Sequence, residues 1–497
     1  MSPRPVSRFL ERLLTFRVKP IEQALAERED PSTQLKRVLG PVDLVMLGVG
    51  GIVGAGIFAL VGTAAAGDAA RPGAGPALVL SFLLTGAACA LAGLCYAEFA
   101  SLAPISGSAY TYAYTTLGEV VAWIIGWDLI LEYAVGNVAV AVSWSGYFCE
   151  LMRGFGIEIP RYLATDLRTA LGDAELLAAA PRVWGVPVVL NLPAAGIIAV
   201  LTALLVLGIR ETAWFNAAMV AVKLAVLGFF VLLGLFYVKP ENWHPFAPNG
   251  WAGIQTGAAM VFFAYIGFDA VSTTAEECRN PRRDLPIGIL GSLAACTLIY
   301  VVVAAVLTGM VPWHELGVAE PLAVAMRVVD QDWAAGIVAF GSVVAHTAVL
   351  LVFQLGQPRI LMAMSRDGLL PSFFGRVHRR LRTPHVATVL TGLFVGTGAA
   401  LASLEEMADL CNIGTLMAFF LVCLGVIVLR QREPHRPRPF RTPGVPWVPL
   451  LGAGACYWLI LGLPDVARVR FALWLVAGLA LYLCYGLRRS RLVRGPV

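Results

Sequence analysis

Residues 44–62 read LVMLGVGGIVGAGIFALVG, an apolar run with glycines at positions 48, 50, 51, 54 and 56. The run has the length and composition of a helix that spans a bilayer. Each glycine inside a helix, however, costs about 0.5–1 kcal/mol relative to alanine. The cluster therefore predicts a helix that is interrupted within the membrane. The alternative is a face of small residues, at Gly50 and Gly54, against which a neighbouring helix packs closely.

The rest of the chain is equally apolar. Of its 497 residues, 58% are apolar and only 14% are charged, whereas soluble proteins carry about 25% charged residues. This composition excludes a soluble globular protein, a disordered chain, a coiled coil, a collagen and a small disulfide scaffold. Runs of helical length predict an all-α membrane protein with about twelve transmembrane helices, at 42–63, 77–103, 119–149, 187–208, 214–238, 251–276, 286–311, 334–364, 385–404, 407–430, 446–463 and 470–487.

Lysine and arginine are distributed unequally between the two sides of these spans. Of the 37 basic residues, 27 fall in segments 1–41, 209–213, 277–285, 356–384, 430–445 and 487–497. The positive-inside rule predicts that these segments are cytoplasmic. Segment 1–41 and the tail 488–497 then place both termini in the cytoplasm. The net charge of +5 reflects this topology and the anionic lipid of the inner leaflet, not a nucleic-acid partner.

A second weakened span lies five helices after the first. Residues 257–277 read GAAMVFFAYIGFDAVSTTAEE and carry Gly267 close to Asp269. Interrupted helices at matching positions predict a transporter built from inverted repeats, here two five-helix halves at 42–238 and 251–430, with 446–487 adding two helices. A broken helix frees amides that attract a carboxylate and carbonyls that accept from an ammonium. An amino acid carries both groups on one carbon.

Ionisable side chains inside spans mark candidate functional positions, because they are expensive at membrane depth. Asp128 and Glu132 are four residues apart in span 3 and share one helix face. Lys223 lies in span 5. Asp128 and Lys223 are each about nine residues, or roughly 14 Å, from the inner end of the span, at the depth of Gly54. They could form one ligand site, or a buried ion pair that only fixes helix packing.

Several other features allow two interpretations. The charged residues near the inner ends of spans could form a gate of ion pairs or be interfacial charges: Glu98, Glu276, Glu277, Arg282, Arg283 and Arg366. Tyrosines 110, 112 and 114 are predicted as interfacial anchors. His346 is more typical of a core histidine than of a titrating group. The nine cysteines show no metal or disulfide spacing, and no catalytic or nucleotide-binding motif occurs, so neither a cofactor, a metal nor an enzyme is expected.

Five stretches in order resemble the cationic amino acid transporter branch of the amino acid–polyamine–organocation (APC) superfamily: GVGGIVGAGIF (48–58), GLCYAEFASLAPISGSAYTYAYTTLGE (93–119), GWDLILEY (126–133), FFAYIGFDAVSTTAEECRNPRRDLPIGI (262–289) and GQPRILMAMSRDGLLP (356–371). The resemblance covers residues 35 to 487. It implies a LeuT-type fold, with ten core helices as two inverted five-helix repeats plus two additional helices. The bacterial members it resembles are twelve-span permeases of the inner membrane.

The resemblance also implies roles for individual residues. The substrate carboxylate would bind the backbone amides of Val53, Gly54, Ala55 and Gly56. Carbonyls and an aromatic gate would come from Phe263, Ala264, Ile266 and Gly267. Asp128, Glu132 and Asp269 would line the side-chain end of the pocket, and Lys223 would occupy the place of a sodium ion, as in proton-coupled relatives. Ala55 departs from the pattern, since relatives often carry a hydroxyl residue there.

The expected function is proton-coupled amino acid transport by alternating access. Three acids against one lysine favour cationic substrates such as arginine, lysine or ornithine. Protonation of one acid would instead suit small neutral amino acids such as alanine. The alternatives are an exchanger or an amino acid receptor or sensor with the same fold. Expected partners are the substrate, protons, the lipid bilayer and, as an open alternative, a small membrane regulatory subunit.

Overall fold

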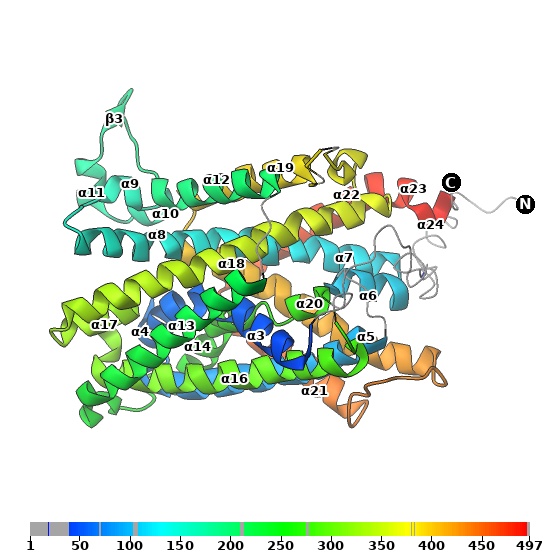
Figure 1. Cartoon of the computed structure of the whole chain (residues 1–497), viewed down its shortest axis with the longest axis horizontal. Helices are drawn as coiled ribbons and strands as arrows, with labels where there is room; N and C mark the ends of the chain where they lie inside the picture. Colours follow the sequence, from blue (N-terminus) through cyan, green and yellow to red (C-terminus); the bar gives the residue numbers. More distant parts are fainter. Residues whose placement is uncertain are drawn as a thin grey trace, which may run out of the picture.

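The computed structural model describes residue 18 and residues 39–68, 71–102, 108–208, 213–274, 278–378, 380–381 and 383–494. Its long helices run roughly along one axis (Figure 1), with helix α24 (Arg491–Arg494) at the right-hand end and strand β3 (Arg182–Val183) at the left-hand end. The end with α24 is the one that the charge distribution predicts to be cytoplasmic. We call it the inner end, and the opposite end the outer end. Apart from residues 18 and 39–41, the predicted N-terminal segment 1–41 lies outside the described residues.

Every predicted span contains helical structure. In chain order the helices are α3 (Pro41–Ile52), η1 (Gly56–Leu60) and α4 (Val61–Ala66) in span 1; α5 (Leu78–Leu102) in span 2; α7 (Glu119–Ile130), η3 (Leu131–Val135) and α8 (Gly136–Gly154) in span 3; α12 (Leu192–Leu207); α13 (Ala213–Gly234); α14 (Gly250–Val261), η6 (Phe262–Tyr265) and α15 (Ala270–Thr273) in span 6; α16 (Pro281–Met310); α18 (Asp332–Arg366); α19 (His385–Leu401); α20 (Leu404–Arg432); α21 (Trp447–Leu461); and α22 (Asp465–Leu481). Within the described residues, seven helices are long and apolar enough to cross a membrane, or up to eight if a bent pair counts as one span, and α12, α19 and α21 are shorter apolar helices. The predicted all-α membrane fold is confirmed.

Short elements connect these helices. They are β1 (Gly67–Asp68), β2 (Arg71–Pro72), η2 (Gly75–Ala77), α6 (Ser108–Thr116), α9 (Arg161–Ala164), α10 (Leu167–Ala170), α11 (Ala174–Ala179), β4 (Val186–Pro187), η4 (Leu235–Tyr237), η5 (Pro240–Trp243), η8 (Trp313–Glu315), α17 (Pro321–Val328), η9 (Ser372–Gly375), η10 (Tyr482–Gly486) and α23 (Leu487–Arg489). Strands β1 and β2 pair antiparallel, as do β3 and β4. The outer loop that carries α9–α11 has a small core of its own, formed by Ala170, Leu176, Ala180 and Val189.

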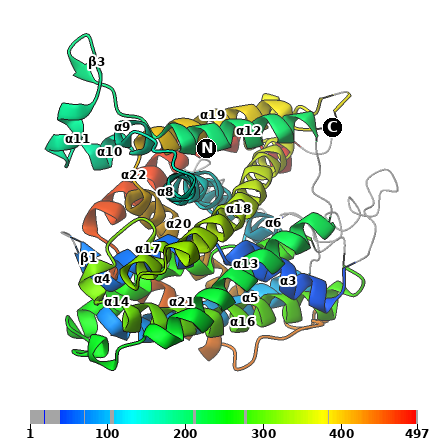
Figure 2. The same ribbon diagram turned by 60° about the vertical axis from the view of Figure 1, so that its left-hand side comes forward.

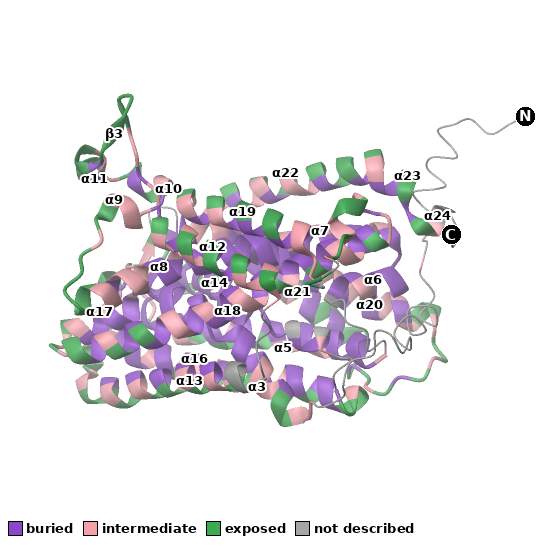
Figure 3. Ribbon diagram, turned by 45° about the horizontal axis from the view of Figure 1, so that its top comes forward, coloured by how far each residue is buried: buried purple, intermediate pink, exposed green. Residues whose placement is uncertain are grey.

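The long helices form one packed bundle. Helix α16 lies along α5 and α3, α18 crosses α8 and α13, and α12 pairs with α19 (Figure 2). Burial is greatest in the middle of the bundle and least on its outer helices (Figure 3). Within its most apolar window, the span Glu119–Gly154 is 83% buried, against 22% for Asp465–Arg489. Span 3 is therefore central, whereas span 12 lies at the periphery.

Local sequence sets where the helices begin and end. Asn191 caps α12, with its side-chain oxygen accepting from the Ala194 amide at 3.2 Å, and the helix ends at Gly208 with φ +80°. Only glycine adopts that left-handed conformation without a penalty. Ser403 caps α20 by accepting from the amide of Glu406 at 3.4 Å.

The tyrosines of α6 are not interfacial anchors, so that prediction is wrong. Tyr110, Tyr112 and Tyr114 are exposed by only 1%, 1% and 2%. Tyr110 donates to Asp367 at 2.8 Å, and its ring stacks on that of Tyr114. The three tyrosine rings pack between α6 and the helices that surround it, and they are therefore buried inside the bundle.

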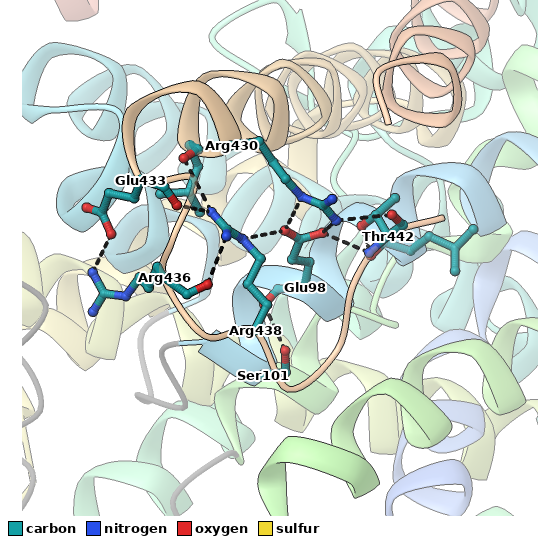
Figure 4. A network of polar contacts seen from close by, with 9 residues as sticks. Glu98, Ser101, Arg430, Glu433, Arg436, Arg438 and Thr442 are labelled. Carbon is teal, nitrogen blue, oxygen red and sulfur yellow. Dashed lines mark hydrogen bonds and ion pairs between the residues drawn. The ribbon is translucent and has the colours of Figure 1, made fainter. Parts of the chain in front are cut away.

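A buried ion-pair network fastens the inner end of α20 to α5 (Figure 4). The Glu98 side chain is fully buried, and both its oxygens accept from the Arg430 guanidinium, at 3.0 and 2.9 Å. Arg438 Nε lies 3.2 Å from the same carboxylate, and the Thr442 amide donates to it at 2.8 Å. Glu98 thus holds residues 430–442 against span 2.

Neither of the two interpretations of Glu98 describes this network. Its partners come from the α20 end and the following loop, not from Arg282, Arg283 or Arg366. Glu276 and Glu277 lie outside the described residues. Glu98 is therefore a buried, paired charge, and not an interfacial one.

The outer end of α20 is held by further ion pairs. Arg71 bonds to Asp409 at 2.8 Å and to Asp68 at 2.6 Å. Burial alone would lower the pKa of Arg71, but the two carboxylates outweigh it and raise the pKa. Glu406 accepts from Arg168 at 2.7 Å and from Arg470 at 3.1 Å. Span 10 is consequently anchored by charge at both ends.

Candidate functional site

The predicted interruption of span 1 is present. Helix α3 ends at Ile52, Val53 is extended with φ −74° and ψ 104°, and the two helical parts meet at 49°. Hydrogen bonding resumes when the amides of Ile57 and Phe58 donate to the Gly54 carbonyl at 3.2 and 3.3 Å. The amides of Ala55 and Gly56 therefore belong to the first turn of the second part, where amides lack helical acceptors and favour an anion.

Span 6 is interrupted at the matching position. Helix α14 tightens into the short 3₁₀ helix η6, Ile266 is extended with ψ 140°, and Gly267 has φ +107°. A residue with a side chain would be strained at that φ. Phe263, Ala264 and Ile266 are all buried at this break.

The two breaks pack directly against each other. A Cβ atom on Gly56 would lie 2.3 Å from the Cα atom of Ala264, and one on Gly267 would lie 2.8 Å from the Gly51 carbonyl oxygen. Both distances are far below van der Waals contact. The glycines are thus needed for the close approach of backbone to backbone, which joins the two interrupted helices into one unit.

Side chains from other spans satisfy the carbonyls that the breaks free. The fully buried Lys223 ammonium on α13 donates to the Gly50 carbonyl and, at 3.0 Å, to the Val53 carbonyl. The Tyr300 hydroxyl on α16 lies 3.0 Å from the Ile52 carbonyl oxygen and 2.9 Å from that of Ala264. Tyr300 therefore bridges both breaks, since one hydroxyl reaches a freed carbonyl from each.

Sequence reasoning missed Tyr300 and two further polar contacts. Tyr147 on α8 donates to the Phe58 carbonyl. Asn412 on α20 donates to the carbonyls of Ala259 and Met260, at 2.9 and 3.3 Å, just before the span 6 break. The available signal was weak: each is one polar group in an apolar run, and such groups usually bond to a neighbouring helix.

The acids gather away from the lysine. Glu132 lies in η3, a single π-helical turn of a type that often marks functional sites. Its carboxyl group faces that of Asp269, with the Thr415 hydroxyl beside it. Both carboxyl oxygens of Asp128, one helical turn earlier, are buried with no hydrogen-bond partner in the described parts of the chain.

Lys223 and the acids do not form the ion pair considered as an alternative. The hydrogen-bond partners of the Lys223 ammonium are the two span 1 carbonyls. Among the described residues, neither Asp128 nor Glu132 has a basic group within 4 Å. The candidate site therefore has a cationic side at the span 1 break and an acidic side between spans 3 and 6.

His346 behaves as a core histidine. It is fully buried, with Nδ1 2.6 Å from the Ser342 carbonyl oxygen and Nε2 2.7 Å from the Ser143 hydroxyl oxygen. Both ring nitrogens are thus satisfied within the bundle when Nδ1 carries the proton and Nε2 accepts from Ser143.

Comparison with known proteins agrees with this geometry. A family model described as amino acid permease matches residues 39–484, almost the whole bundle. The chain belongs to the amino acid permease family.

Relatives of this permease are named after different substrates. The methylthioribose transporter of Bacillus subtilis is 45% identical over 96% of this chain and 99% of its own length. The branched-chain amino acid permease of the same organism is 46% identical over 96% and 98%. The mouse cationic amino acid transporter 4 is 39% identical over 87% of this chain and 65% of its own length.

These similarities confirm the resemblance described from the sequence. The permease is a multi-pass membrane protein that carries a small molecule, and its relatives are named as transporters or permeases, not as enzymes. These relatives are named for different substrates, so their names do not indicate which substrate this permease transports.

Proposed function

We propose that this permease couples amino acid uptake to protons by alternating access. The observation that carries the proposal is the Lys223 ammonium bonded to the Gly50 and Val53 carbonyls. A fixed cation at the span 1 break supplies the positive charge that a bound sodium ion would otherwise supply. Burial also disfavours the charged form of a lysine, so that a buried lysine can release and rebind a proton during the cycle.

The proposed substrate site lies between the two breaks and the acids. First-turn amides of Ala55 and Gly56 would hold the α-carboxylate, and the carbonyls of span 6 would accept from the α-ammonium. Residues 42–238 and 251–430 would act as the two inverted repeats around this site, with 446–487 outside them. We propose that the protein lies in the inner membrane with both termini cytoplasmic, and that a small membrane regulatory subunit is among its partners.

Uptake into proteoliposomes tests the function. With an acidic exterior and no sodium, labelled substrate should accumulate, and collapse of the pH gradient should stop it. A receptor or sensor would bind substrate without accumulation. An exchanger would need amino acid loaded inside the vesicles. Either result would refute proton-coupled uptake.

The charge of the acidic side supports a proposal for the substrate class. Glu132 and Asp269 face each other, and the carboxyl oxygens of Asp128, one turn away, are buried without a hydrogen-bond partner among the residues that the structure describes. Like charges so close and so poorly solvated repel strongly. A substrate cation would relieve this repulsion, which favours arginine, lysine or ornithine. One proton shared within the Glu132–Asp269 pair would relieve it as well, and that favours a neutral amino acid.

Asp269→Asn separates the two substrate classes. If the substrate is cationic, we expect arginine to bind about tenfold more weakly, equivalent to about 1.4 kcal/mol, with alanine binding little changed. Ligand-induced thermal stabilisation of the purified protein measures both affinities. Asp166→Asn is the matched control, because Asp166 is a buried aspartate in the outer loop that caps α10, a role asparagine also fills. Equal losses for arginine and alanine, or no arginine binding by the unmodified protein, would exclude the cationic assignment.

A further inference from the structure

A basic hollow lies at the inner end of the bundle, between the ends of α18 and α19 and remote from the helix breaks. It has a volume of about 730 Å³ and is lined by Arg376, Val377, His378, Arg380 and His385. None of these described lining residues is acidic. The surrounding sequence RVHRRLRTPH (376–385) also contains no carboxylate, and its Arg379 and Arg382 lie outside the described residues.

The loop around the hollow is held in place by hydrogen bonds. The His378 amide donates to the Thr383 carbonyl at 2.8 Å, which closes the loop on itself. The Thr383 hydroxyl donates to the Val206 carbonyl at 3.1 Å, near the inner end of α12. On the other side, the Ser365 hydroxyl donates to the Pro371 carbonyl at 2.8 Å and ties the loop start to α18. Hydrogen bonds of the described residues thus connect the two sides of the hollow to α12 and α18.

Two histidine rings add further polar groups to the hollow. His378 Nδ1 accepts from the amides of Arg380 and Leu381, at 3.3 and 3.1 Å. Nε2 of His378 consequently carries the ring proton. Nδ1 of His385 is buried without a hydrogen-bond partner among the described residues, and its ring lies edge-on to that of His378 at 5.1 Å.

We propose that this hollow binds a phosphate group, carried either by an anionic phospholipid of the inner leaflet or by a soluble phosphate. One guanidinium group can donate two parallel hydrogen bonds to the oxygens of a phosphate. The hollow also lies beside the inner ends of α12, α18 and α19, and basic pockets between the ends of membrane helices take such groups. The site is separate from the substrate site and does not depend on the proposed transport cycle.

The test uses the purified full-length protein. It is reconstituted into nanodiscs of phosphatidylcholine with or without phosphatidylglycerol, and native mass spectrometry counts the phosphatidylglycerol that stays bound. In a second arm, inorganic phosphate is added to protein in phosphatidylcholine alone, and thermal stabilisation reports binding. Retained phosphatidylglycerol identifies a lipid ligand, whereas stabilisation by phosphate alone identifies a soluble one.

The double variant Arg376→Gln/Arg380→Gln should bind the anion about 30-fold more weakly. Both arginines are exposed, so their loss does not disturb packing. Arg488→Gln/Arg489→Gln removes the same charge from another exposed part of the inner end and should bind like the unmodified protein. Equal weakening in both double variants would show a diffuse charge effect and overturn the proposal, as would the absence of binding in both arms.

Discussion

Lys223→Met should reduce proton-driven uptake to background while the protein still reaches the membrane. The change removes the donor that Gly50 and Val53 share, and each buried carbonyl left without a partner costs about 1–3 kcal/mol. It also removes the positive charge at the span 1 break. Methionine keeps the length and most of the volume of the side chain, so the surrounding helices can stay packed.

The initial rate of labelled amino acid uptake under an imposed pH gradient measures the effect. Lys239→Met is the matched control, because Lys239 is exposed at the outer end of span 5 and should tolerate the change. Full proton-driven uptake by Lys223→Met, at equal protein per vesicle, would show that the ammonium takes no part in coupling.

Glu98→Gln should lower the free energy of unfolding by about 3 kcal/mol, because it leaves Arg430 and Arg438 beside a neutral group in a buried site. Glutamine keeps the shape and can still accept from Arg430 and from the Thr442 amide. The expected loss is therefore mainly electrostatic. Denaturant titration of the purified protein in mild detergent measures it.

The same network supplies its own control. Glu433 pairs with Arg436 at 2.6 Å, but its side chain is 40% exposed. Exposed pairs of this kind contribute about 0–1 kcal/mol, so Glu433→Gln should change stability little. If the two variants lost equal stability, burial of Glu98 would not be what makes its ion pairs strong.

The position of the spans and of the breaks was predictable from the sequence, because both depend on local composition. Apolar length alone decides whether a segment fits the bilayer. The glycines from 48 to 56 and Gly267 disfavour a continuous helix wherever the rest of the chain lies. Backbone chemistry at the break, with free amides on one side and free carbonyls on the other, follows from the interruption itself.

The partners of the breaks were not predictable, because they depend on how distant helices pack. Tyr300 is one of several tyrosines in apolar surroundings, and only the fold shows that its hydroxyl reaches carbonyls of Ile52 and Ala264. Depth counting placed Lys223 and Asp128 at one level, but equal depth does not fix which way a side chain points. The tyrosines of α6 show the same limit, since a connecting segment can be covered by its neighbours.

Three glutamates, Glu98, Glu150 and Glu406, each form ion pairs with two arginines. The two partners of Glu150 are Arg153 and Arg327. An arginine in such a triplet can be substituted without leaving the carboxylate unpaired, because the remaining arginine still neutralises its charge. No second carboxylate is present in the triplet, so loss of the glutamate removes the shared partner of two arginines at once. Over evolutionary time the arginine positions are therefore free to change one by one, whereas the glutamates can change only together with their partners.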